Sequence, residues 1–92
     1  MRSRQNVVGP KIRQIRYQLG LTQNELSARI GLQGWDISRG TLSQIEAQIR
    51  CVTDFELLCI ARALRLAPQD LLPSVAETRK TLKTFFPPRP AD

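Results

Sequence analysis

Three helix-start signals divide this chain and constrain its fold more than any other feature of the sequence. Each is a capping box, in which Ser or Thr is followed three residues later by Glu: Thr22 with Glu25, Thr53 with Glu56, and Ser74 with Glu77. In a capping box the hydroxyl accepts a hydrogen bond from the third helical amide, while the carboxylate accepts one from the cap amide. The sequence therefore predicts helices that begin near residues 22, 53 and 74.

The spacing of apolar residues predicts the remaining helices and the core. From Val8 to Leu19 the apolar residues are spaced four, three and four apart, which defines one face of a first helix that Gly20 ends. Ser38 caps a third helix that runs to about residue 48, and a short fifth helix is predicted over residues 68–72. The expected inward positions of the second, third and fourth helices are Leu26, Ile30, Leu42, Ile45, Glu46, Ile49, Leu57, Ile60, Ala61 and Leu64.

No stretch has a strong strand pattern and no segment repeats, so the predicted fold class is all-α, a compact bundle of five helices. Residues 1–7 are predicted to be a basic, flexible leader, and residues 8–73 the folded domain. Residues 74–86 can add a sixth, C-terminal helix. The proline-rich residues 87–92 are predicted to be a disordered tail.

The charge balance favours a polyanionic partner. The chain carries 14 Lys and Arg against 8 Asp and Glu, a net charge of +6, and it has no His. Most of the cations are Arg, whose guanidinium suits phosphate contacts. Without His, the commonest general base and the His-containing zinc sets are missing, so an enzyme, a metal site and a cofactor are not expected. Cys51 and Cys59 are predicted to be reduced thiols, and no apolar run reaches the roughly 20 residues of a membrane span, so we expect a soluble, cytoplasmic protein.

A longer pattern covers most of the predicted domain. Residues 15–26 end in LTQNEL, residues 38–46 end in LSQIE, and the stretches 30–31, 57–64 and 70–72 complete the pattern. Together they resemble the Cro and phage-repressor type of helix-turn-helix regulators, also called XRE-like. The resemblance implies a helix-turn-helix DNA-binding domain and a sequence-specific transcriptional regulator that acts as a homodimer on a near-palindromic operator of double-stranded DNA. The alternative is a protein-interaction module, such as an antitoxin-like partner, built on the same fold.

One segment departs from the family pattern, because residues 33–37 are inserted before the third helix. Two packings can absorb them. In the first, which we favour, the second helix continues to about Gln33 and ends with Gly34 in the left-handed conformation, which folds Trp35 back onto the helix. In the second, the helix ends at Gly31 and the insert forms a loop that turns Trp35 outward.

The outward face of the predicted third helix is short, polar and rich in hydrogen-bond donors. Only side chains near the N-terminus of a helix in the major groove reach base edges. The predicted base contacts are therefore Arg39, Gly40, Thr41, Ser43 and Gln44. Phosphate contacts are expected at the helix starts, from Thr22, Gln23 and Ser38, and the resemblance adds Arg50.

Two further sets of residues are assigned to contacts other than DNA. Arg16 and Glu46 both lie beside apolar faces, and the resemblance implies that they form a buried ion pair between the first and third helices. A second apolar stripe is predicted on the outer face of the fourth helix, and it extends into the C-terminal segment. These residues are candidates for a dimer contact, unless the segment covers the stripe of its own subunit: Phe55, Cys59, Ala63, Leu66, Val75, Leu82, Phe85 and Phe86.

Overall fold

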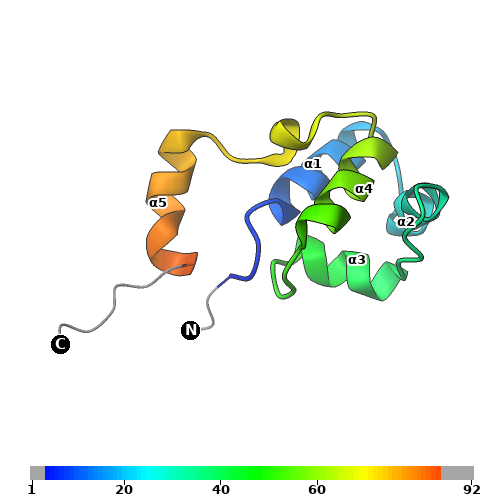
Figure 1. The fold of residues 1–92 in the computed structure, drawn as a ribbon, viewed down its shortest axis with the longest axis horizontal. Helices are drawn as coiled ribbons and strands as arrows, with labels where there is room; N and C mark the ends of the chain where they lie inside the picture. Colours follow the sequence, from blue (N-terminus) through cyan, green and yellow to red (C-terminus); the bar gives the residue numbers. More distant parts are fainter. Residues whose placement is uncertain (1–3, 86–92) are drawn as a thin grey trace.

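The computed structural model describes the backbone of residues 4–85 and the side chains of residues 4–80. The described chain forms five α-helices and one 3₁₀ turn, with no strand among them: α1 (Gly9–Gln18), α2 (Gln23–Leu32), α3 (Arg39–Glu46), α4 (Asp54–Ala63), η1 (Pro68–Leu71) and α5 (Val75–Phe85). The predicted all-α class is therefore confirmed. The predicted short fifth helix is the 3₁₀ turn η1, and the sixth helix is α5 (Figure 1).

Side-chain caps start α2, α4 and α5 where the sequence predicts them. The amide of Glu25 donates to Thr22 Oγ1 at 3.0 Å, and the amide of Thr22 donates to Glu25 Oε1 at 3.0 Å. The corresponding residues at the starts of α4 and α5 make the same two bonds. A cap contributes about 1 kcal/mol, so local sequence fixes each of these helix starts.

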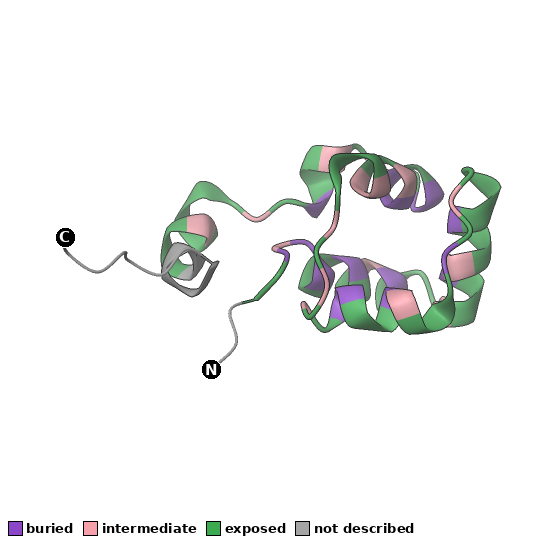
Figure 2. Ribbon diagram, turned by 60° about the horizontal axis from the view of Figure 1, so that its bottom comes forward, coloured by how far each residue is buried: buried purple, intermediate pink, exposed green. Residues whose placement is uncertain are grey.

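The first four helices enclose a single apolar core. α2 packs against both α3 and α4, α1 packs against α3, and η1 packs against α4. Figure 2 shows the buried positions on the sides of these helices that face one another. Burial of a large apolar side chain contributes about 1.5–3 kcal/mol, so this core holds α3 firmly against its neighbours. The fully buried large side chains are Ile12, Leu26, Ile30, Leu42, Ile45, Ile60 and Leu71.

Two residues that the spacing assigns to the core are exposed instead. Leu19 is 50% exposed because α1 ends before it, and Gly20 then turns the chain with φ +68°. Ile49 is 60% exposed because α3 ends at Glu46, earlier than predicted, and Gln48 adopts φ +64°. Both residues lie beyond the end of their helix, where helical spacing no longer applies. The core assignment of both side chains is therefore wrong.

The predicted outer stripe of α4 is only partly present. Ala63 is 5% exposed and belongs to the core, while Cys59 and Leu66 are partly buried against it. Arg65 adopts φ +58°, which ends the helix and bonds the Leu66 amide back to α4 at 2.8 Å. This turn brings Leu66 against the core, so Phe55 is the one strongly exposed member of the four, at 77%.

The segment before α1 is packed against the end of α3. The predicted flexible leader covers residues 1–7, yet Asn6 is only 7% exposed. Its side-chain amide donates to the carbonyls of Ile45 and Arg50 at 3.0 and 2.8 Å, and its oxygen accepts from the Gly9 amide at 2.8 Å. A Cβ atom at Gly9 would collide with the Ile45 carbonyl, so only glycine fits this approach of α1 to α3.

Residues 33–37 adopt the first of the two packings. Gln33 is the C-cap of α2, and Gly34 follows with φ +103°. Trp35 is half-buried and packs against the core. The insert therefore supplies the C-cap and the turn that end α2, and the chain's one Trp helps to seal the core.

α5 stands apart from the four-helix body in both ribbon views, Figure 1 and Figure 2. Val75, at its start, is 73% exposed. The predicted dimer residues Leu82 and Phe85 belong to α5, but their side chains lie outside the described part, and Phe86 and residues 87–92 lie beyond it. No helix of the described part is both long and apolar enough to cross a membrane.

Candidate nucleic-acid interface

α3 has a buried inward face and a polar outward face. Ser38 caps the helix, and its hydroxyl accepts a hydrogen bond from the Thr41 amide at 3.1 Å. Leu42, Ile45 and Glu46 point inward and are buried. The predicted base-contact residues lie on the other side, exposed except for the half-buried Thr41: Arg39, Gly40, Thr41, Ser43 and Gln44. The helix therefore presents these residues together to a ligand.

Arg16 and Glu46 form a bidentate ion pair between α1 and α3. Arg16 Nε donates to Glu46 Oε2 at 2.8 Å, and Arg16 Nη2 donates to Glu46 Oε1 at 2.9 Å. Both residues are buried, and Arg16 Nη1 also donates to the Leu21 carbonyl at 2.9 Å. The hydrogen bonds to Glu46 raise the pKa of Arg16 above its ordinary value, so the guanidinium is held in its charged form.

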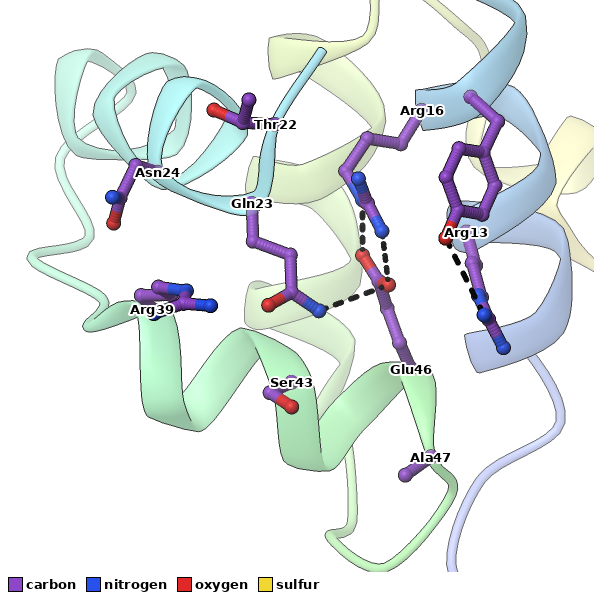
Figure 3. A pocket seen from close by; sticks show the side chains of 10 residues that line it. Arg13, Arg16, Thr22, Gln23, Asn24, Arg39, Ser43, Glu46 and Ala47 are labelled. Atoms are coloured by element: carbon purple, nitrogen blue, oxygen red, sulfur yellow. Dashed lines mark hydrogen bonds and ion pairs between the residues drawn. The ribbon is translucent and has the colours of Figure 1, made fainter.

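Gln23 joins α2 to the same ion pair. Its side-chain amide donates to Glu46 Oε1 at 3.3 Å, so one carboxylate of α3 is bonded to both α1 and α2 (Figure 3). The Thr22 hydroxyl is engaged in the capping box, whereas the amides of Gln23 and Asn24 point out of the helix end without a helical acceptor. The predicted phosphate contacts at this end of α2 thus combine backbone donors with the positive end of the helix dipole.

A groove of about 720 Å³ lies between α1, the start of α2 and α3 (Figure 3). Arg13 and Tyr17 line it from α1, and Arg39 and Ser43 line it from α3. Glu46 is the one carboxylate among its described lining residues, and Arg16 neutralises that charge. The groove is therefore positively charged and rich in donors, which suits a polyanion.

Four residues of this groove are not among the predicted base and phosphate contacts or the predicted ion pair: Arg13, Tyr17, Asn24 and Ala47. Arg13 and Tyr17 are four residues apart, a spacing that places both on the same side of α1, next to Arg16. That spacing is the signal that would have identified them. Asn24 lies inside the first capping box, where its sequence context indicates a helix start and nothing more.

Arg50, an expected phosphate contact, is bonded within the protein and does not line the groove. Its Nη2 and Nη1 donate to the Glu56 carboxylate at 2.9 and 3.1 Å, and Nη1 also donates to the Cys51 carbonyl at 3.0 Å. The guanidinium lies 5.6 Å over the Trp35 ring. The hydrogen bonds between Arg50 and Glu56 raise the pKa of Arg50 and lower the pKa of Glu56. Arg50 thus connects the link after α3 to Trp35 and to the start of α4.

The two cysteines are free thiols, Cys51 exposed and Cys59 partly buried. The Cys51 thiol donates to Gln5 Oε1 at 3.3 Å. Within the described side chains, no group of three or more His, Cys, Asp or Glu residues is placed to hold a metal ion.

Comparisons with known proteins agree with this geometry. A family described as helix-turn-helix matches residues 12–71. The crystal structure of the restriction-modification controller protein C.AhdI from Aeromonas hydrophila superimposes with a TM-score of 0.63 and 28% sequence identity, covering 71% of this chain and 91% of that chain. A search of curated proteins finds no match. The resemblance inferred from residues 15–72 is therefore confirmed.

Proposed function

Because the chain belongs to the XRE-like helix-turn-helix family of DNA-binding transcriptional regulators, we propose that it reads a specific, near-palindromic operator as a homodimer. The observation that carries this proposal is the outward face of α3, which is polar, exposed and held at both sides. Glu46 is bonded to Arg16 of α1 and to Gln23 of α2, so the rest of the domain sets the direction of that face. A helix held in this way can enter a major groove about 12 Å wide with its N-terminal side chains against base edges.

Arg39 and Gln44 are the proposed base readers. Arg donates two bonds to guanine O6 and N7, and Gln pairs with adenine N6 and N7. Among the described residues, neither side chain makes a hydrogen bond or ion pair that would have to break before it could contact a base. Thr41 and Ser43 add shorter, adaptable contacts along the same face.

Gly40 supports a close approach of α3 to the bases. Its backbone is helical, and a Cβ atom there would meet only Ser38 Oγ, at 3.9 Å, so the fold itself does not require glycine. Glycine is nevertheless less favourable than alanine in a helix, by about 1 kcal/mol in the interior and by less in a first turn, where Gly40 lies. We therefore assign Gly40 to contact with DNA, where the absence of a side chain lets the backbone come near.

The starts of α2 and α3 are the proposed phosphate contacts. Thr22 and Gln23 lie at the start of α2 beside the positively charged groove, and Ser38 lies at the start of α3. Amides at a helix start, together with the helix dipole, favour an anion. Arg50 contributes through structure, because its bonds to Glu56 and its contact with Trp35 hold the links on either side of α3.

The homodimer is proposed from exposed apolar side chains on α4 and α5. Phe55 and Val75 are 77% and 73% exposed, and Leu58 is 42% exposed. Two recognition helices must lie about 34 Å apart to enter successive major grooves, and a twofold contact fixes that distance. The solved relative is described as a controller protein, which supports a regulatory role here without naming the genes regulated.

Selection of bound duplexes from a random-sequence library tests the proposed function. We expect enrichment of one motif whose two halves are related by a twofold axis and separated by about one helical turn. No enrichment, together with copurification of a protein partner, would support the antitoxin-like alternative instead. A single enriched half-site would keep DNA reading and reject the dimer.

A further inference from the structure

The groove continues past the helix-turn-helix onto α1. Two exposed side chains there, Arg13 and Tyr17, have no proposed role in base reading. Arg13 and Tyr17 line the same hollow as Arg39 and Ser43. In Figure 3 the Arg16–Glu46 pair lies between them, with Arg39 at one end of the groove and Arg13 at the other. Neither Arg13 nor Arg39 has an ion-pair partner among the described residues.

Arg13 and Tyr17 are bonded to each other in a way that leaves donors facing the groove. Arg13 Nη2 donates to the Tyr17 hydroxyl oxygen at 3.3 Å. Because that oxygen accepts, the hydroxyl hydrogen is directed elsewhere, and the guanidinium keeps its remaining N–H groups. An oxygen-rich anion beside the pair can therefore accept from both side chains at once, as a phosphodiester does.

The position of the pair is set by its neighbours. The guanidinium of Arg16 lies 4.7 Å from the centroid of the Tyr17 ring, and that of Arg13 lies 5.4 Å from it. Arg16 is itself buried and bonded to Glu46 at 2.8 Å, so one side of the Tyr17 ring contacts a guanidinium that other residues hold in place. A contact arranged before binding loses less conformational freedom on binding.

The local potential at the Tyr17 hydroxyl also favours negative charge. The hydrogen bond from Arg13, followed by the charges of Arg13 and Arg16, lowers the pKa of Tyr17 below its ordinary value. A lowered pKa means that the protein stabilises the negatively charged phenolate. The electrostatic potential at this point of the surface is therefore positive. The same potential attracts the phosphate of a nucleic acid.

We propose that Arg13 and Tyr17 form an additional phosphate-binding pair on α1, which holds the DNA strand whose neighbouring phosphates meet the start of α2. This inference rests on the proposed function and extends it beyond the helix-turn-helix. The pair contributes affinity for any sequence, because phosphate contacts position the protein and base contacts specify the site.

Three substitutions test the pair: Arg13→Gln, Tyr17→Phe and the control Arg62→Gln. Arg62 is exposed on α4, does not line the groove, and its loss changes net charge as the loss of Arg13 does. Affinity for the library-selected duplex is measured by fluorescence anisotropy over a series of salt concentrations. Thermal unfolding of each variant checks that these exposed substitutions leave the fold intact.

Arg13→Gln is expected to weaken binding about tenfold at moderate salt, because a hydrogen bond to a charged group is lost. It is also expected to lower the slope of log affinity against log salt by about 0.9, the value for one phosphate. Tyr17→Phe keeps the ring and the charge, so we expect about threefold weaker binding with an unchanged slope. Arg62→Gln is expected to match the wild type in slope.

Neutral methylphosphonate substitutions in the duplex separate direct contact from an indirect effect. At one phosphate position, methylphosphonate substitution should weaken binding by the wild type but should not weaken binding by Arg13→Gln. If Arg13→Gln keeps the wild-type slope, or stays sensitive at every position, the pair does not bind phosphate and only this inference fails. If the wild type binds no duplex, the proposed function fails with it.

Discussion

The Arg50 guanidinium lies 5.6 Å over the Trp35 ring while its two terminal nitrogens donate to Glu56 at 2.9 and 3.1 Å. This contact joins the turn that precedes α3 to the link that follows it. Glu56 is also the third residue of α4 and completes its capping box, where its carboxylate accepts from the Thr53 amide at 2.9 Å. The Glu56 carboxylate therefore caps α4 and also holds Arg50, which connects the two segments on either side of α3.

The Arg50–Glu56 pair predicts a specific loss of stability in acid. Glu56 has a pKa lowered in the folded state by the Arg50 hydrogen bond, whereas an unfolded Glu titrates near about 4.3. The stabilisation is therefore present above that pH and is lost as pH falls through the lower folded-state pKa. Arg50→Met keeps an apolar stem on Trp35 but removes the charge, so its unfolding free energy should fall less steeply with acid than that of the wild type. Urea unfolding at several pH values measures the difference. If the unfolding free energies of the two proteins changed with pH in parallel, the Arg50–Glu56 pair would not be the source of the acid sensitivity.

The Arg16–Glu46 pair predicts strong coupling in a double-mutant cycle. Each single substitution, Arg16→Met or Glu46→Gln, leaves a buried polar partner and should cost about 3–5 kcal/mol of unfolding free energy. The double variant should cost clearly less than the two added together, because neither charge is then left unpaired. Denaturant unfolding supplies all four free energies. A coupling below about 0.5 kcal/mol would show that the pair does not hold α1 to α3.

Gly40 predicts a substitution that separates folding from DNA binding. Gly40→Ala should raise the unfolding free energy by up to about 1 kcal/mol, because alanine favours the helix and the added methyl meets only Ser38 Oγ, at an ordinary contact distance of 3.9 Å. The same change should weaken binding to the selected duplex, because the methyl group occupies space needed by DNA. Unfolding and anisotropy measurements on one preparation compare the two effects. Unchanged binding would remove Gly40 from the interface.

Base reading by Arg39 and Gln44 predicts a change of preference rather than a uniform loss. Alanine at either position should cost about 1–3 kcal/mol of binding free energy on the selected duplex and relax selection at one base pair. Arg62→Ala, on α4 and outside the groove, provides the control for removal of an exposed arginine. Repeating the library selection with each variant gives the result directly. An unaltered motif after Arg39→Ala would mean that Arg39 does not read bases.

The proposed dimer predicts that charge on α4 or α5 will separate the subunits. Phe55→Glu and Val75→Glu each place a carboxylate on a strongly exposed apolar position, and burying it in an interface would be costly. Leu32→Glu is the matched control, since Leu32 is 86% exposed at the end of α2. Sedimentation velocity should show monomers for the first two variants and a dimer for the control. A dimer that persists in both would place the contact elsewhere.

Helix starts could be predicted from sequence, and so could the two helix ends that Gly20 and Gly34 mark, whereas the ends of α3 and α4 could not. The starts of α2, α4 and α5 each depend on two side chains three residues apart, so a short stretch contains the whole signal. The ends of α3 and α4 depend on Gln48 and Arg65, which adopt positive φ although neither is glycine. The Gln48 conformation is supported from far along the chain, since its side chain donates to the Asn6 carbonyl and its own carbonyl accepts from Gln5, both at 2.9 Å. No local pattern reports such contacts.

In the candidate site, too, some features could be predicted from the sequence and others could not. The polar face of α3 follows from helical periodicity, and the partnership of Arg16 with Glu46 was suggested by resemblance to the family. The bond from Gln23 to Glu46 and the engagement of Arg50 by Glu56 depend on where separate helices meet, which the sequence alone did not reveal. The position of Arg13 and Tyr17 beside the start of α2 depends on the same packing.

The attachment of α3 through Glu46 separates recognition from architecture. The buried carboxylate anchors the helix, whereas the side chains of Arg39, Ser43 and Gln44 are exposed and have no hydrogen-bond partner within the described residues. Substitutions there that keep a good helix former cost little folding free energy, so selection acts on these positions mainly through the target sequence. Related chains can thus diverge in the operators they read while their scaffolds stay superimposable, and new regulatory circuits can arise by changes at a few surface positions.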